Sequence, residues 1–187
     1  MTRQIFLFDR PDRFVAGTVG MPGERTFFLQ ASAGARLVSV SLEKQQVALL
    51  ADKLEQLLDE VVTRTGTALP ASGADTDALE LPIDEEFRVS AMGLAWNSDA
   101  GLVVIEAQAP TEDVATAEQT LLEDVEDGPD ALRVLMEPTR ARAFVERARQ
   151  VISAGRPPCP LCGRPLATDG HICPRSNGYH RGAALSP

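Results

Sequence analysis

The residues best suited to chemistry are three cysteines and a histidine near the carboxyl end of this 187-residue chain. Two residues separate Cys159 from Cys162, and Cys173 follows closely after His171. Thiolate sulfur and neutral imidazole nitrogen are the donors of structural zinc sites, which are four-coordinate and leave no position for a catalytic water. The spacing therefore predicts a structural zinc site with Cys159, Cys162, His171 and Cys173 as ligands. His180 is the alternative to His171, since it lies a comfortable loop length beyond Cys173.

The pair Cys159 and Cys162 has a competing interpretation as a redox centre. Cys-x-x-Cys pairs that exchange thiols usually lie at a helix N-terminus in a thioredoxin-like body. Prolines precede this pair, and Gly163 and Pro165 follow it, so a helix is disfavoured here. We therefore favour zinc over a redox pair, another metal or plain thiols. Zinc binding contributes about 10–16 kcal/mol in zinc-finger peptides, more than so short a tail could gain from a core.

The composition is that of a globular protein, with 44% hydrophobic and 24% charged residues. The formal net charge is −9, which disfavours binding to nucleic acid and to anionic membranes. No apolar run approaches the roughly 18 residues of a membrane-spanning helix, and the run at residues 5–8 is too short for a signal peptide. We expect a cytoplasmic protein with no membrane contact. In that reducing compartment, clustered cysteines favour metal ligation over a disulfide.

Charge is distributed unevenly along the chain. The tail from residue 156 onward carries a net +3, which leaves −12 on residues 1–155. Residues 110–130 contain eight acidic residues and no basic one. For this acidic segment we favour a solvated loop over a partner-docking element.

Before the tail, the sequence predicts an α+β body with a mainly antiparallel sheet, built from two halves that each run from strands to a helix. Residues 5–8, 14–19, 26–31 and 37–40 have the composition of strands, separated by turn residues. Ser41 is expected to cap the following helix through its hydroxyl. That helix has an apolar stripe, which we expect to pack on the sheet: Val47, Leu50, Leu54, Leu57, Leu58 and Val61.

The second half repeats this order. Strands are predicted at residues 87–96, 102–107 and 132–136, and a helix follows with Pro138 near its start and Gly155 as its C-cap. Residues 65–79 are rich in small and polar residues and predict a flexible connection. We therefore divide the chain into a first half (1–64), a linker (65–80), a second half (81–155) and a zinc-binding tail (156–187).

Four segments carry a resemblance to a known family. They are FDRPDRF at residues 8–14, GERTFFLQA at 23–31, GRPPCPLCG at 155–163 and GHICPRSNGY at 170–179. Over essentially its whole length the chain resembles an actinobacterial family of uncharacterised proteins. The resemblance implies a cytoplasmic bacterial protein with a metal-binding tail, and it favours His171 over His180 as the fourth ligand. It implies no catalytic residues.

Common catalytic motifs are missing from the sequence. There is no Gly-x-Ser-x-Gly elbow, phosphate-binding glycine loop or His-Glu-x-x-His motif. Both histidines lie in or beside the tail, which excludes histidine base chemistry in the body and leaves carboxylate chemistry open. The best candidate for such a site is the cluster Asp9, Arg10, Asp12 and Arg13, for which a solvated turn is the favoured interpretation. Trp96 and Tyr179 could stack on a ligand, but we assign Trp96 to the partly buried core and Tyr179 to the metal knuckle.

Three function classes remain. The favoured one is a non-catalytic binding or assembly protein, zinc-stabilised, with an unidentified protein partner. The alternatives are an enzyme with a carboxylate-based site, and weak nucleic-acid binding through Arg156, Arg164, Arg175 and Arg181 of the tail. A small set of arginines on a chain of net charge −9 makes a weak nucleic-acid surface. The sequence leaves the oligomeric state open.

Overall fold

The computed structural model describes residues 3–21, 23–66, 68–70, 73–112, 114–154, 161–162 and 173. The first half comprises β1 (Ile5–Asp9), β2 (Arg13–Val19), β3 (Thr26–Ala33), β4 (Arg36–Leu42) and α1 (Lys44–Thr65). The second comprises β5 (Glu85–Arg88), β6 (Ala91–Asn97), β7 (Leu102–Gln108), α2 (Val114–Thr120), β8 (Ala131–Met136) and α3 (Pro138–Ser153). This order confirms the predicted α+β class with two halves that each run from strands to a helix.

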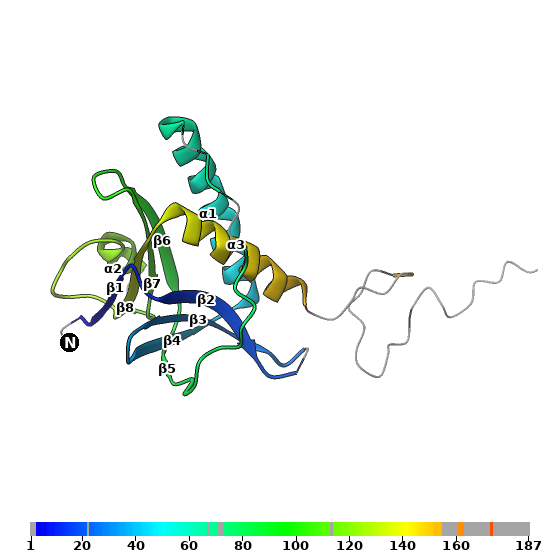
Figure 1. The fold of residues 1–187 in the computed structure, drawn as a ribbon. Coiled ribbons are helices and arrows are strands. Elements are labelled where there is room, and N and C mark those ends of the chain that lie inside the picture. The colour runs from blue at the N-terminus through cyan, green and yellow to red at the C-terminus, as the bar shows by residue number, and fades with distance from the viewer. Residues whose placement is uncertain are drawn as a thin grey trace, which may run out of the picture.

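The strands form two four-stranded sheets, and each half contributes one strand to the sheet of the other half (Figure 1). One sheet has the order β1-β8-β7-β6, and the other has the order β2-β3-β4-β5. The β1–β8 and β4–β5 pairs are parallel, and the remaining pairs are antiparallel. The halves are thus joined by strand pairing. The domain boundaries themselves stay a prediction.

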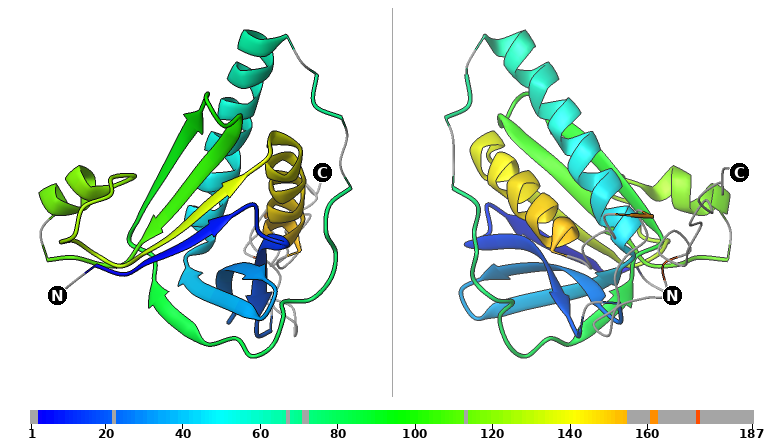
Figure 2. Two further views of the ribbon diagram at one scale, coloured as in Figure 1. Left: turned by 60° about the vertical axis from the view of Figure 1, so that its left-hand side comes forward. Right: turned by 90° about the vertical axis from the view of Figure 1, so that its right-hand side faces the viewer.

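Both sheets and the helices α1 and α3 share one apolar core, and the two helices lie side by side (Figure 2). The predicted stripe of α1 is confirmed as its core face, with Leu57 only half-buried. In β7, Val103, Ile105 and Ala107 belong to the core, so Glu106 and Gln108 lie on the opposite face of the sheet. Among the described residues, no helix has the length and apolar character needed to cross a bilayer.

Helix α1 begins later than predicted. Ser41 does not cap it, because the ladder between β3 and β4 continues through Leu42 and pairs Ser41 with Phe28. The N-cap is Glu43, whose backbone N–H donates to Gln46 Oε1 at 2.8 Å. A serine shortly before a helix usually indicates an N-cap, but here Ser41 is held in the β3–β4 ladder and cannot cap the helix.

The single strand predicted at residues 87–96 is wrong, since this segment forms β5 and β6 in different sheets. The N–H of Val89 donates to Ser41 O at 2.7 Å, and the N–H of Ser90 donates to Gln108 O at 2.8 Å. Two consecutive residues therefore bond to different sheets, and the chain turns from one sheet to the other between them. Apolar alternation along the chain carries no information about such a corner.

Candidate functional site

The predicted zinc ligands are only partly covered by the described residues. Cys159 and His171 lie outside them, as do His180, Tyr179 and the predicted helix cap Gly155. Cys162 is half-buried, and Cys173 is buried with 5% exposure. Three thiols and one imidazole are a donor set that fits a closed structural zinc site. Zinc ligation by Cys159, Cys162, His171 and Cys173 stays a prediction.

The structure divides the candidate cluster at residues 9–13. Asp9 and Arg10 form an exposed ion pair at 3.2 Å. Asp12 accepts a hydrogen bond from the Gly34 N–H at 2.7 Å. These are interactions of surface turns, which agree with the favoured interpretation. Arg13 alone takes part in a larger polar network.

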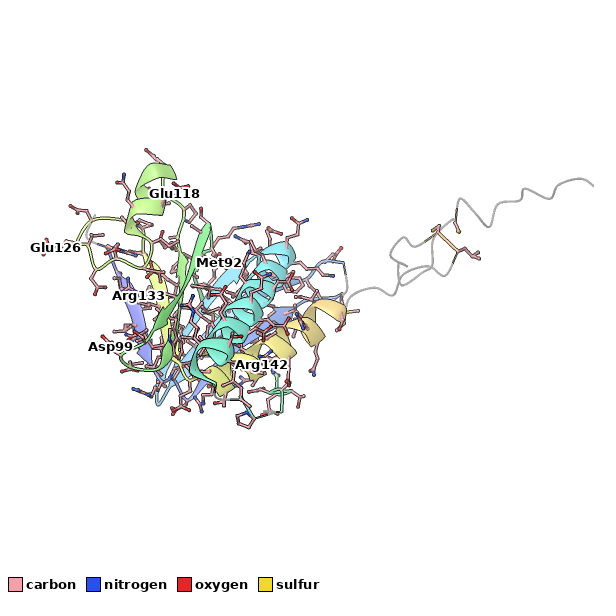
Figure 3. All side chains as sticks on the ribbon, turned by 90° about the horizontal axis from the view of Figure 1, so that it is seen from above. Met92, Asp99, Glu118, Glu126, Arg133 and Arg142 are labelled. Carbon is pink, nitrogen blue, oxygen red and sulfur yellow. The ribbon has the colours of Figure 1, made fainter. Side chains whose placement is uncertain are left out.

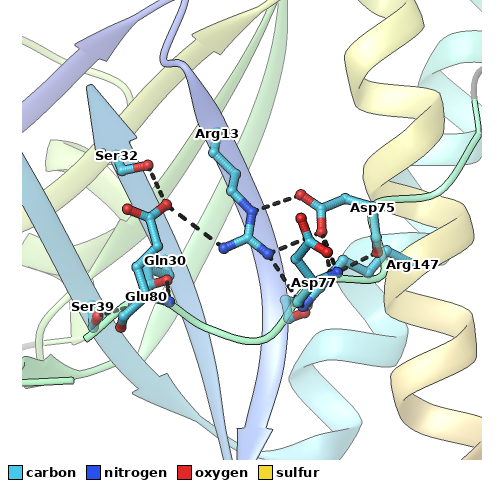
Figure 4. A network of polar contacts seen from close by, with 9 residues as sticks. Arg13, Gln30, Ser32, Ser39, Asp75, Asp77, Glu80 and Arg147 are labelled. Atoms are coloured by element: carbon cyan, nitrogen blue, oxygen red, sulfur yellow. Dashed lines mark hydrogen bonds and ion pairs between the residues drawn. The ribbon is translucent and has the colours of Figure 1, made fainter. Parts of the chain in front are cut away.

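In that network, Arg13 of β2 and Arg147 of α3 hold Asp75 between them (Figure 4). Arg13 donates from Nε to Asp75 Oδ2 at 2.6 Å and from Nη2 to Oδ1 at 2.9 Å. Arg147 donates from Nη1 to Asp75 Oδ1 at 2.6 Å and from Nη2 to Asp77 O at 2.7 Å. Residues 75–77 belong to the stretch whose composition predicted a flexible connection, and they are held here against a strand and a helix.

The pairing changes the pKa values of its members. The hydrogen bond from Arg13 lowers the pKa of Asp75 below its ordinary value, although burial acts in the opposite direction. The same bond raises the pKa of Arg13. Burial lowers the pKa of Arg147, and the negative charge of Asp75 offsets this only in part. Asp75 is therefore held ionised, whereas a general acid or base needs a pKa near the operating pH.

A cavity of about 210 Å³ opens beside this network, between β2 and α3. Its lining includes Asp75 and Arg147 together with Phe14 and Phe144, whose rings stack with their centroids 4.8 Å apart. Arg147 Nε also donates to Ala16 O at 2.7 Å. The charged groups of this cavity thus chiefly bind one another and nearby carbonyl oxygens, which is the arrangement of a structural clamp.

Glu106 of β7, a strand of the other sheet, is a second carboxylate held between two arginines. These are Arg3 and Arg133, and the side chain of Glu106 has no exposure. Arg3 Nη2 donates to Glu106 Oε1 at 2.7 Å, and Arg133 Nε donates to Oε2 at 2.5 Å. Both arginines also donate to Glu123 O, at 2.8 and 2.9 Å. The acidic segment 110–130 is therefore partly helical and bonded to the sheet, where the sequence favoured a solvated loop.

The two sheets have four edge strands, and charge protects three of them. Arg36 Nη1 donates to Leu7 O of β1 at 2.8 Å, and Arg147 Nε donates to Ala16 O of β2. Strand β5 has only four residues, three of them charged. Charged side chains and short strands prevent a sheet edge from pairing with another chain.

Among the described residues, none gives the fourth edge strand, β6, any of these protections. Its seven residues include no charge and no proline, and its register with β7 is unbroken. Within the part of the chain that the structure describes, residues 91–96 make no hydrogen bond outside the β6–β7 ladder. On the outer side of β6, a row of backbone N–H and C=O groups thus has no partner among the described residues, which would let a further strand pair there.

An apolar groove of about 370 Å³ lies beside this edge, between β6 and α1. The strand contributes Met92 and Leu94, and the helix contributes Leu49, Leu50 and the charged Lys53; Met92 lies next to α1 in Figure 3. Leu49 is 55% exposed. An open edge beside side-chain pockets is the arrangement of strand-addition sites, in which backbone bonds give affinity and pockets give specificity.

No sequence motif indicated this groove. Trp96 lies in the partly buried core, as predicted. The signal that could have revealed the groove is Leu49, a large apolar residue outside the apolar stripe of α1. The exposure of β6 as an edge follows from strand order, for which the local sequence offers no signal.

Comparison with known proteins identifies a family. A family model matches residues 6–173, a range that includes the β6 edge, the groove and the Asp75 network. Neither the curated proteins nor the solved structures include a match. The resemblance to a family of uncharacterised proteins is thereby confirmed, and its actinobacterial origin stays a prediction. Because the model covers well over half of its length, the chain belongs to the family described as "Protein of unknown function (DUF3090)".

Proposed function

We propose that this chain is a non-catalytic binding or assembly protein that accepts an extended polypeptide strand at β6. The observation that carries the proposal is an uncharged edge strand, paired with β7 on one side only, that lies directly beside an apolar groove. In a sheet, alternate side chains point to the same face. An added strand would therefore place every second side chain on the groove face, where Met92 and Leu94 already lie.

The groove also indicates the chemistry of its partner. Leucine and methionine side chains line most of it, so apolar contact is expected to supply most of the affinity. Lys53 is the charged residue of the lining and favours a partner segment that carries a carboxylate. A charge at such a rim affects orientation and association rate more than affinity. The expected partner is an extended segment with alternating apolar residues, and a carboxylate near Lys53 would help to orient it without being needed for affinity.

We further propose that zinc organises the tail of this cytoplasmic protein, with Cys159, Cys162, His171 and Cys173 as its ligands. The donor set supports this, because three thiolates and one imidazole complete a structural site. Metal ligation would fold a segment that is too short to build its own core. The net +3 of the tail would then form an ordered basic surface on an otherwise acidic protein.

A carboxylate-based enzyme is the alternative that the cavity between β2 and α3 favours. Asp12, Asp75 and Arg147 all contribute to its lining. Arginines bind Asp75 from two sides, however, and so occupy the oxygens that a catalytic carboxylate would present to substrate. For this reason we prefer the binding role.

The binding role can be tested with a labelled synthetic peptide that has valine at alternate positions, serine between them and one glutamate. Fluorescence anisotropy should show binding to the intact protein. Leu49→Lys should weaken binding by about tenfold or more, equivalent to about 1.4 kcal/mol of lost apolar contact. Met21→Lys is the matched control, because Met21 is 67% exposed but does not line the groove. The proposal fails if the wild-type protein, diluted until it is monomeric, does not bind, or if a peptide with a central proline binds equally well.

The zinc proposal has its own test in metal analysis of the purified protein. About one zinc ion per chain is expected. Cys162→Ser should release its metal to a chelator at concentrations that leave the wild type and Ser176→Ala loaded. Full retention of zinc by Cys162→Ser would show that this thiol is not a ligand.

A further inference from the structure

We infer that the strand that docks on β6 is β6 of a second copy of this chain, which gives a symmetric dimer. The inference rests on the proposed function and names its partner. It follows from the order of side chains along the edge, from the charge around the groove, and from the protection of the other edges.

The side chains of β6 are complementary to their own sequence. An antiparallel pairing centred on Leu94 places Leu94 opposite the partner's Leu94 and Met92 opposite the partner's Trp96. Cross-strand pairs that involve aromatic side chains stabilise antiparallel sheets, and methionine sulfur makes favourable contacts with aromatic rings. Met92, Leu94 and Trp96 are each half-buried and pack against the core, so they share the groove face of the strand.

Charge favours this edge over the rest of the surface as a self-association site. Two copies with a net charge of −9 repel one another in general. Strand β6 is uncharged, so this repulsion is weakest there. Lys53, which lines the groove, has the opposite sign to the net charge of the second copy.

In the resulting dimer, the outer backbone N–H and C=O groups of β6 gain hydrogen-bond partners. A two-fold axis perpendicular to the sheet joins the two β1-β8-β7-β6 sheets into one continuous sheet. Both α1 helices then lie on the same face of that sheet, with the exposed Leu49 of each copy near the axis. The same surface is used by both copies, as a closed two-fold interface requires.

The first test is the mass of the intact protein by analytical ultracentrifugation across micromolar concentrations. The wild type and Met21→Lys should sediment as dimers that dissociate on dilution. Leu94→Lys should be monomeric, because it places a charge at the centre of the pairing. Leu49→Lys is a second variant, whose exposed site leaves folding intact, and it should raise the dissociation constant by about tenfold or more. Added salt should strengthen the wild-type dimer by screening the repulsion between like charges.

The second test measures register by disulfide cross-linking. Directly opposed residues in an antiparallel pair have Cα atoms about 4.5–5.5 Å apart, within the range that a disulfide can join. Leu94→Cys should therefore form a covalent dimer under mild oxidation, with the cross-link located by peptide mapping. Met92→Cys should not cross-link to itself, since it lies opposite the partner's Trp96. The double variant Met92→Cys and Trp96→Cys should cross-link.

The outcomes separate this inference from the proposed function. A wild type that is monomeric throughout would overturn the dimer, and binding of the valine–serine peptide by that monomer would still support strand docking. A dimer that Leu94→Lys and Leu49→Lys leave intact would place the interface elsewhere and would also overturn the inference. A Met92→Cys cross-link at position 92 would overturn the register centred on Leu94.

Discussion

Strands β2 and β6 are both edges of four-stranded sheets, yet charged side chains bond to the outer side of β2 and not, among the described residues, to that of β6. Along β2, Arg147 bonds to Ala16 O, and Arg13 and Asp75 hold the chain segment that lies beside the strand. Along β6, no charged side chain bonds to the edge among the described residues. The difference does not reflect a lack of charge near β6, because Lys53 lines the adjacent groove. Protection of an edge here depends on which segments the fold brings to it.

The sheet that contains β6 also has a network of charged side chains, but this network lies on the outer face of the sheet. Glu106 of β7 is fully buried between Arg3 and Arg133, and this network holds the acidic segment over the outer face. That network covers the face of the sheet and leaves its β6 edge open. At β2, charged side chains stabilise the fold, whereas the uncharged edge of β6 is a surface available for binding.

Among changes to charged side chains, the largest effect is expected from removing the protection of β2. Arg147→Met should lower the free energy of unfolding by about 3 kcal/mol, because the buried Ala16 O loses its donor, and Asp77 O and the Asp75 carboxylate lose it too. Urea unfolding measures this change. Arg149→Met is the control on the same helix, where an exposed pair with Glu55 is worth about 0–1 kcal/mol. Equal losses in the two variants would contradict the assignment of Arg147 as a clamp.

A smaller, pH-dependent effect is expected at Asp75. Its pKa is lowered in the folded state, so its contribution to stability is complete above the unfolded pKa of about 3.9 and is lost as the pH falls through the folded pKa. Asp75→Asn should therefore be less stable than the wild type at neutral pH, and this difference should shrink on acidification below about pH 4.

Urea unfolding at neutral and acidic pH tests this expectation. Asp9→Asn provides the charge control, because it breaks only an exposed pair. A difference between the wild type and Asp75→Asn that grows towards low pH would show that the sign is wrong.

The smallest effect on stability is expected at the β6 groove. Leu49→Lys should change the free energy of unfolding by no more than about 0.5 kcal/mol, because Leu49 is an exposed side chain. Leu50→Ala, at a fully buried neighbour, should cost about 2–5 kcal/mol. Thermal unfolding of the two variants tests whether the groove can be altered independently of the fold. A large loss in Leu49→Lys would mean that this residue belongs to the core.

Much of the fold was accessible from local patterns. The α1 stripe at Val47, Leu50 and Leu54 repeats at helical spacing and is buried as expected. The two halves that each run from strands to a helix were also recognisable. The errors at Ser41 and at the junction of β5 and β6 have one origin: bonds to distant strands determine where those elements end.

The candidate site was much less accessible. The cysteine and histidine spacing indicates a metal, because ligands close in sequence suffice to define a zinc site. The Asp75 clamp joins residues 62 and 72 positions apart, so composition alone suggested a flexible connection. The β6 groove combines a helix from the first half with a strand from the second, and only Leu49 gave any sign of it.

Local sequence was thus sufficient for most of the secondary structure, the acidic character and the expected metal donors, since each depends on residue type and short-range spacing. Strand order and the protection of each edge could come only from the three-dimensional arrangement. Pairing β1 with β8 and β5 with β4 leaves β6 at an edge. Those pairings are set by burying one shared core, to which residues from both halves of the chain contribute.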